Sequence, residues 1–229
     1  MLTNYLKQKQ EQLNNKSMDF YTPTGMHVYM QTPVDGVDVE SVIHKIENKL
    51  PHHFLDEIEM IVFGWFDEFE ERSINAFYKD NAIYVSHMQQ DEDDLFDDLV
   101  HEISHSLEEA HGYQIYADEK VKKEFLRKRK YLHDILWQAG YRAPLSFFQD
   151  IEFNQEFDNF LYKKIGYDKL ASMMSGLFIS PYAATSLREY FATGFTEYYM
   201  DSNHNFLQKV SPAVVEKIKL LQDTEKLDF

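Results

Sequence analysis

The chain has 229 residues, 44% of them hydrophobic and 15% aromatic, which is enough apolar material for one domain with a sizeable core or two small ones. Its formal net charge of −16 disfavours general nucleic-acid binding, and no run approaches the roughly 18 apolar residues that a membrane helix needs. There are no cysteines, so disulfides are excluded and a bound zinc would need histidine and carboxylate ligands. No signal peptide is visible, which favours a cytoplasmic protein.

The first half of the chain predicts a small mixed or antiparallel sheet. Residues 1–20 are polar and are expected to form an N-terminal helical or frayed arm, and residues 39–50 have the apolar spacing of a helix. Four segments alternate in hydrophobicity or are rich in β-branched and aromatic residues, and they are predicted as strands: 26–30, 57–66, 75–78 and 82–86. Lys79-Asp80-Asn81 joins the last two strands and predicts a hairpin turn.

Residues 91–111 predict an amphipathic helix that carries an H-E-x-x-H motif. In a helix, His101 and His105 leave the same face one turn apart, so both imidazoles can bind one Zn²⁺. Glu102 lies beside them and can take a proton from a metal-bound water. The motif therefore predicts a metal, a base and the hydrolysis of a peptide bond. The alternative is a chance match on an acidic, solvated helix.

From the motif helix to the C-terminus the pattern is helical, so the sequence predicts an α+β fold with the motif helix between a sheet and a mostly helical second half. Seven of the eleven residues from 120 to 130 are basic. They are either a recognition helix for nucleic acid or a helix face that pairs with the acidic remainder, and the net charge favours the second interpretation.

A catalytic zinc usually has three protein ligands, and the motif supplies two. His111 has the spacing of the third metzincin histidine, but Glu108 stands where that pattern needs glycine. On a continuous helix His111 would lie roughly 9 Å along the axis from His105, which is too far for the same ion. The other source is a carboxylate on a later helix over residues 186–200, where Glu189 and Glu197 are the candidates.

The segment Ser180–Ala192 resembles gluzincin metalloproteases of the anthrax lethal factor type, which include the clostridial Pro-Pro endopeptidases. In that family a tyrosine lies seven residues before the zinc-binding glutamate, within a Y-x₆-E-[FY]-F-A stretch. Tyr182 and Glu189 have this spacing, and Tyr190-Phe191-Ala192 follows. The tail Asp201–His204, ahead of a last helix that follows Pro212, is also similar.

The resemblance covers roughly residues 58–221 and implies a single zincin-like metallopeptidase domain over 1–229, with the motif helix as its active-site helix. His105 and Glu189 are 84 residues apart, about double the separation expected of the family. Residues 118–174 are therefore interpreted as a helical insertion.

The resemblance implies a zinc endopeptidase in which His101, His105 and Glu189 hold Zn²⁺. Glu102 would activate the zinc-bound water, and Tyr182 would donate a hydrogen bond to the developing oxyanion. The expected partner is a peptide or protein substrate, with no membrane and no nucleic acid involved. The alternative is a catalytically silent binding or scaffold protein that keeps the zincin fold.

Members of this family also resemble one another in an edge strand above the metal, which pairs with the extended substrate. Residues 82–86, just before the motif helix, are the candidate, and they predict substrate contacts at Ile83, Tyr84 and Val85.

Overall fold

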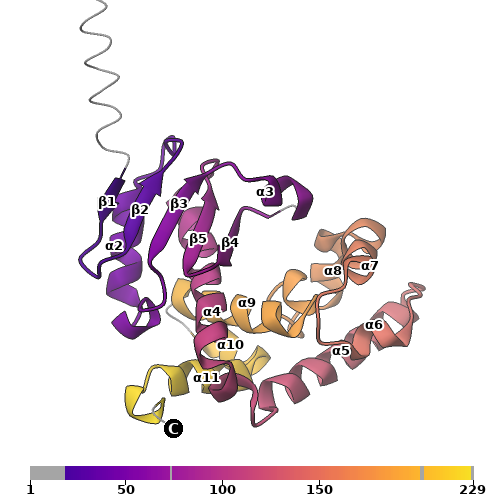
Figure 1. The fold of residues 1–229 in the computed structure, drawn as a ribbon. Coiled ribbons are helices and arrows are strands. Elements are labelled where there is room, and N and C mark those ends of the chain that lie inside the picture. The colour runs from indigo at the N-terminus through magenta and orange to yellow at the C-terminus, as the bar shows by residue number, and fades with distance from the viewer. Residues whose placement is uncertain (1–18, 73, 202–203, 228–229) are drawn as a thin grey trace, which may run out of the picture. The chain divides into compact units, whose positions relative to one another are not determined.

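A computed structural model describes residues 19–72, 74–201 and 204–227. Most of the expected N-terminal arm lies outside these residues. Contacts between Cα atoms group the chain into two compact units, residues 1–106 and 107–229 (Figure 1). The expected single domain stays a prediction.

The first unit contains a five-stranded mixed sheet with the order β1-β2-β3-β5-β4. Strands β2 (His27–Met30), β3 (Met60–Gly64) and β5 (Ala82–Ser86) run parallel. The two edge strands, β1 (Asp19–Tyr21) and β4 (Ala76–Lys79), pair antiparallel with β2 and β5. β3 and β5 are almost wholly buried, as expected of central strands that are covered on both faces. The mixed sheet in the first half is thus confirmed.

The hairpin between β4 and β5 is confirmed, and its turn explains why these residues form it. Asp80 and Asn81 take φ values of 51° and 61°, the two left-handed positions of a type I′ turn. Asn and Asp tolerate this conformation better than most residues, and the turn's twist matches that of the flanking strands.

One prediction about the sheet is wrong. Residues 82–86 were expected at an edge, but β5 pairs with β3 on one side and with β4 on the other. The main chain at Ile83, Tyr84 and Val85 is therefore occupied by neighbouring strands and offers no edge to a peptide. The edge belongs to β4, because β5 returns to pair with β3 and leaves the first strand of the hairpin outside.

Besides the first part of the motif helix, the described residues of the first unit contain two α-helices and a 3₁₀ turn. In α2 (Val39–Lys49), Asp38 caps the N-terminus by accepting the Ser41 N–H at 3.0 Å. A short 3₁₀ turn, η2 (His52–Phe54), follows, and α3 (Asp67–Arg72) precedes β4. Figure 1 shows α2 running alongside the β1–β2 end of the sheet.

The motif helix, α4 (Glu92–Tyr116), crosses the boundary between the two units. In the first unit it lies beside α2, because Lys45 Nζ is 2.9 Å from Asp93 Oδ1 and stands 4.6 Å above the Phe96 ring. The predicted apolar stripe is buried throughout: Leu95, Leu99, Ile103 and Leu107. The helix runs one turn beyond its predicted end, with a break only at His111 (φ −122°, ψ 24°), beside Gly112.

The second unit is mostly helical over its described residues, as predicted. Its elements are α5 (Lys120–Gln138), α6 (Leu145–Gln149), α7 (Gln155–Asn159), the π-helical η3 (Phe160–Ile165), α8 (Tyr167–Met173), η4 (Tyr182–Ala184), α9 (Leu187–Met200), α10 (Asn205–Val210), α11 (Pro212–Leu221) and η5 (Thr224–Lys226). Helices α5, α9 and α11 pack on one another around buried aromatic rings. Gly194 marks the closest approach of α9 to α11, because a Cβ there would lie 2.8 Å from Val214 Cγ1.

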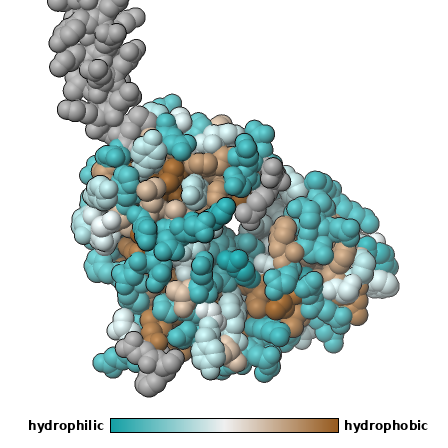
Figure 2. Space-filling view, viewed as in Figure 1, coloured by the Kyte–Doolittle hydropathy of each residue, from teal (hydrophilic) through white to brown (hydrophobic). Residues whose placement is uncertain are grey.

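The surface agrees with the acidic, charged composition. Figure 2 shows a face that is mostly hydrophilic, with apolar residues in small separate patches. Among the described residues, no helix has both the length and the apolar character needed to span a bilayer.

Candidate metal centre and active site

His101, Glu102 and His105 come together on α4 as the motif predicts. Each can offer one ligand atom, and these atoms all lie within 4.8 Å of one another. The two imidazole rings are 5.0 Å apart and nearly perpendicular, and His105 and Glu102 are buried. Two imidazoles and a carboxylate at this spacing suit a borderline-soft divalent cation such as zinc, so the group could hold a metal ion.

Glu102 is held by the main chain of the edge strand. The Tyr78 N–H of β4 donates to Glu102 Oε2 at 2.8 Å. In an antiparallel pair, successive residues turn their N–H groups alternately toward and away from the partner strand. Asn75 O accepts from Ser86 N, so Tyr78, three residues later, turns its N–H away from β5. The outer side of β4 therefore faces the candidate base.

A second carboxylate lies one turn before Glu102. Burial raises the pKa of Asp98 to about 7, against the hydrogen bond that Gln89 Nε2 donates at 3.2 Å, and the nearby charges of Asp94, Asp97 and Glu102 raise it further. The helix face that carries Glu102 therefore has a second carboxyl group, Asp98, on the preceding turn.

Tyr182 and Glu189 belong to the second unit. Tyr182 opens η4, and its carbonyl accepts the Thr185 N–H at 2.9 Å and the Thr185 Oγ1 hydrogen at 2.8 Å. Ser186 is the N-cap of α9, and its Oγ accepts the Glu189 N–H at 3.1 Å. Both candidate side chains are half-buried. Hydrogen bonds therefore hold the main chain at both ends of the segment from Tyr182 to Glu189.

The rival third ligands occupy different positions. His111 sits at the break in α4, whereas Glu108, which replaces the metzincin glycine, keeps helical geometry as predicted. Glu197 is half-buried near the C-terminal end of α9, two turns beyond Glu189. Ser202 and Asn203 of the tail motif lie outside the described residues.

Glu108 has a role that its sequence position did not suggest. Its buried carboxylate accepts a hydrogen bond from Tyr116 Oη and lies 3.5 Å from Arg188 Nε. Burial raises the pKa of Tyr116, and the Glu108 charge raises it further. Because Arg188 directly precedes Glu189, Glu108 ties the last turns of α4 to the start of α9.

Tyr167, in the segment interpreted as an insertion, lies near Tyr182 and Glu189. Its Oη donates to Asp158 Oδ1 at 2.7 Å. Burial and this hydrogen bond raise the pKa of Tyr167, and the charges of Tyr182 and Glu189 add to the effect. No motif in the sequence singles out Tyr167, because only the tertiary fold places it near these two residues.

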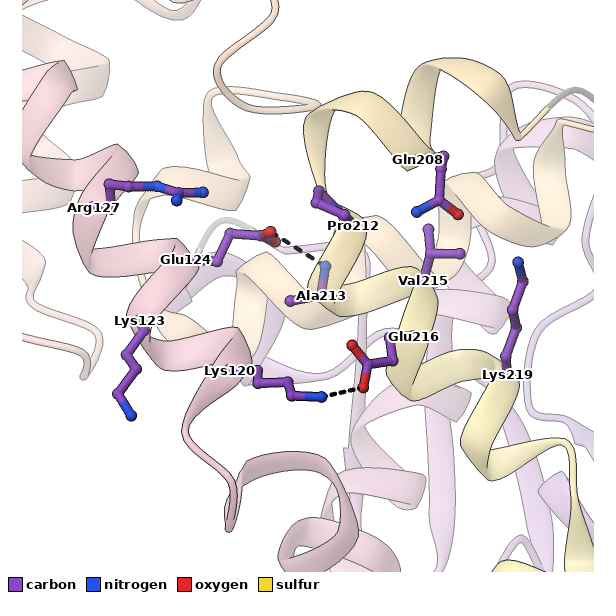
Figure 3. Close-up of a pocket in the computed structure, with 10 residues that line it drawn as sticks. All are labelled: Lys120, Lys123, Glu124, Arg127, Gln208, Pro212, Ala213, Val215, Glu216 and Lys219. Atoms are coloured by element: carbon purple, nitrogen blue, oxygen red, sulfur yellow. Dashed lines mark hydrogen bonds and ion pairs between the residues drawn. The ribbon is translucent and has the colours of Figure 1, made fainter.

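Some residues of the basic run in α5 are buried, and others form ion pairs at the surface. Lys128 and Arg129 are buried, whereas Lys120 and Lys123 form ion pairs with Glu216 and Glu119. A groove of about 780 Å³ between α5, α10 and α11 is lined by part of the run (Figure 3). Two of its walls are already joined, since Lys120 bonds Glu216 and the Glu124 carboxylate accepts the Ala213 N–H at 3.2 Å. The groove contains none of the candidate site residues.

Comparisons with family models, curated proteins and solved structures give no significant match. The resemblance to gluzincins of the lethal factor type therefore remains a prediction from the motifs.

Proposed function

We propose that this chain is a zinc-dependent endopeptidase of the gluzincin class. His101 and His105 would hold the metal, with Glu189 as the third protein ligand. The observation that carries the proposal is the surrounding of Glu102. A buried carboxylate lies beside two imidazoles with metal-ligand spacing, and its Oε2 is fixed by the main chain of a sheet edge. A solvated acidic helix would show neither the burial nor this hydrogen bond.

The chain's own residues divide the work of hydrolysis. Zinc, when bound, would acidify a water molecule and polarise the scissile carbonyl. The Tyr78 N–H orients Glu102 through Oε2, which leaves Oε1 to take the proton of the attacking water and to pass it to the leaving amine. The Tyr182 phenol would donate to the oxyanion that develops on the attacked carbonyl.

The substrate we propose is an extended peptide that adds to the outer side of β4. In this proposal β4 takes the substrate-binding role that the sequence predicts for β5, because β5 is paired on both sides. β4 is a terminal strand of the sheet, and its outward main chain at Tyr78 bonds directly to Glu102. Because Glu102 already accepts the Tyr78 N–H, a peptide on this edge would pair with other outward main-chain groups of β4 and would lie beside the proposed base.

The test is metal analysis of the purified protein together with a peptide-library cleavage profile. We expect near-stoichiometric zinc in wild type and in Glu102→Gln, because Glu102 is the base and not one of the three ligands. Cleavage should fall roughly 10²–10⁴-fold in Glu102→Gln, the usual contribution of a general base. Glu109→Gln, an exposed change on the same helix, is the matched control and should cleave like wild type.

Two results would contradict the proposal in different ways. A protein that stays metal-free with zinc in excess would refute the metal centre. Zinc bound without cleavage of any library peptide would instead favour a silent binding protein that keeps the fold.

A further inference from the structure

Arg129, in the middle of α5, has the largest side chain that the described part of the chain buries completely, with 1% of its surface exposed. In the sequence it belongs to a basic run, whose members are expected to reach solvent. No described carboxylate forms an ion pair with it, and its Nε has no described hydrogen-bond partner. Such a buried cation needs a physical explanation.

The guanidinium is compensated by carbonyl groups and aromatic faces. Nη1 donates to Ala184 O at 2.5 Å and to Thr185 O at 3.1 Å, and Nη2 donates to Phe147 O. The guanidinium carbon stands 4.2 Å from the centre of the Phe157 ring, within the range of a cation–π contact. Burial lowers the pKa of Arg129, although the Asp150 charge opposes the shift, so these partners act on a desolvated cation.

The two carbonyls that accept from Nη1 lie in the short stretch of chain that runs from η4 into α9. Ala184 ends η4, which Tyr182 opens, and Thr185 precedes Ser186, the N-cap of α9. Both carbonyls therefore lie between Tyr182 and Glu189. The Thr185 bonds to Tyr182 O and the Ser186 bond to Glu189 N fix the two ends of this stretch, and Arg129 fixes its middle.

Stability alone is a poor explanation for this arrangement. Replacing buried charges by well-packed apolar groups is often neutral or stabilising, because desolvation offsets much of what the charge gains. What a planar guanidinium supplies is direction, since its fork of donors binds carbonyls at fixed angles. One arm of the fork, Nη1, holds the carbonyls of Ala184 and Thr185, and the other arm, Nη2, holds Phe147 O of α6, so the fork joins α6 to the stretch of chain that runs from η4 into α9.

We propose that Arg129 is a positioning residue, which sets the main-chain path from Tyr182 to Glu189 and thereby aims both side chains. The inference rests on the proposed function, because it gives this path the task of presenting a phenol and a metal-binding carboxylate. It also gives the segment 118–174 a purpose, since α5 contributes the arginine and α6 contributes the Phe147 carbonyl.

The experiment measures the zinc dissociation constant by competition with a chelator, in wild type, Arg129→Lys, Glu189→Gln and the double variant. Lysine keeps the charge but loses the fork. We expect Arg129→Lys to weaken zinc roughly 10- to 100-fold, as outer-sphere changes at metal sites do. In the Glu189→Gln background the same change should cost little more, since no third ligand is left to aim.

Lys128→Met is the matched control, because it removes the neighbouring buried cation of the same helix. Lys128 bonds Val210 O and Ser211 Oγ, which lie outside the segment 182–189. It should leave the zinc dissociation constant within about twofold of wild type, whatever it does to the melting temperature. Arg129→Gln, which keeps an amide donor, replaces the lysine variant if that variant does not fold.

Unchanged zinc affinity in Arg129→Lys, or a loss fully additive with Glu189→Gln, would overturn the inference. If wild type and Glu189→Gln bind zinc equally, the third ligand and the proposed function fail instead. Amide hydrogen exchange of the metal-free proteins then decides the positioning alone. Faster exchange over 182–189 in Arg129→Lys but not in Lys128→Met would uphold it, and equal exchange would refute it.

Discussion

At the scale of single residues, the Tyr78 N–H is the group that determines how Glu102 is presented. A hydrogen bond to a charged acceptor contributes about 1.5–3 kcal/mol, so losing it should misorient the Glu102 carboxylate, the proposed base. The donor is a main-chain atom, which has no signature in the sequence. The spacing of the H-E-x-x-H motif on a helix predicts His101, Glu102 and His105, but it cannot predict what holds the glutamate.

Tyr78→Pro removes this N–H without breaking a bond of the sheet, because the N–H points away from β5 and proline is tolerated on the outer side of an edge strand. We expect kcat to fall by roughly 10- to 100-fold, the rate equivalent of the lost hydrogen bond, with zinc content unchanged. Tyr78→Ala, which keeps the N–H but loses the ring and the hydrogen bond from its hydroxyl to Asn81 Oδ1, is the control. Equal rates for the proline and alanine variants would show that the hydrogen bond does not matter.

Lys128 gives a residue-scale prediction about pH. Burial lowers its pKa to about 8, although the Glu124 charge opposes the shift. The unfolded chain thus binds more protons than the folded chain between about pH 8 and pH 10.5, and stability should rise with pH across that window. The gain is up to about 3 kcal/mol.

The measurement is the free energy of unfolding in urea at several pH values, for wild type and Lys128→Met. As the pH rises from 8 to 10, the free energy of unfolding of wild type should increase relative to that of Lys128→Met. A difference that does not change with pH would mean that Lys128 remains charged at no cost in the folded chain.

At the scale of elements, the packing of α9 on α11 fixes the helix that carries Glu189. Gly194→Ala would normally favour a helix by about 1 kcal/mol, but the new Cβ would lie 2.8 Å from Val214, a buried and stiff β-branched side chain. Overpacking of this kind costs about 1–3 kcal/mol, so we expect net destabilisation. The measurement is the midpoint of urea unfolding.

Gly112→Ala is the matched comparison, because a Cβ on Gly112 in α4 meets no atom within 4 Å. It should stabilise by about 0.5–1 kcal/mol. Shifts of the same sign in the two variants would refute the close contact at Gly194. Adding Val214→Ala to Gly194→Ala should recover part of the loss.

Elements whose residues follow a local rule could be predicted from the sequence. The type I′ hairpin at Asp80-Asn81, the Ser186 cap and the stripe of α4 all obey local periodicity or capping chemistry. The order of the strands could not be predicted, because which strands pair is decided by contacts distant in the sequence. The expectation of an edge strand at residues 82–86 fails for this reason.

At the scale of the whole molecule, the charge of −16 does not describe every environment within it. Arg129 and Lys128 are buried in the second unit, although the sequence gives them the same appearance as their exposed neighbours Arg127 and Lys130. From a run of basic residues in the sequence, a solvated cation cannot be distinguished from a buried one that binds carbonyls. The positioning role of α5, unlike the zinc motif, was therefore beyond sequence reasoning.

If the proposed peptide pairs with the four-residue strand β4, the geometry of the strand limits which bond in a substrate is cut. Outward groups recur at every second residue of a strand, so a long peptide that slides along β4 by two residues, roughly 7 Å, restores the same main-chain pairing. A slide of one residue turns the wrong groups inward. The strand can thus exclude registers that differ by one residue, but it cannot choose among registers that differ by two. That choice falls to side chains that flank the cut, and they define the substrate's identity.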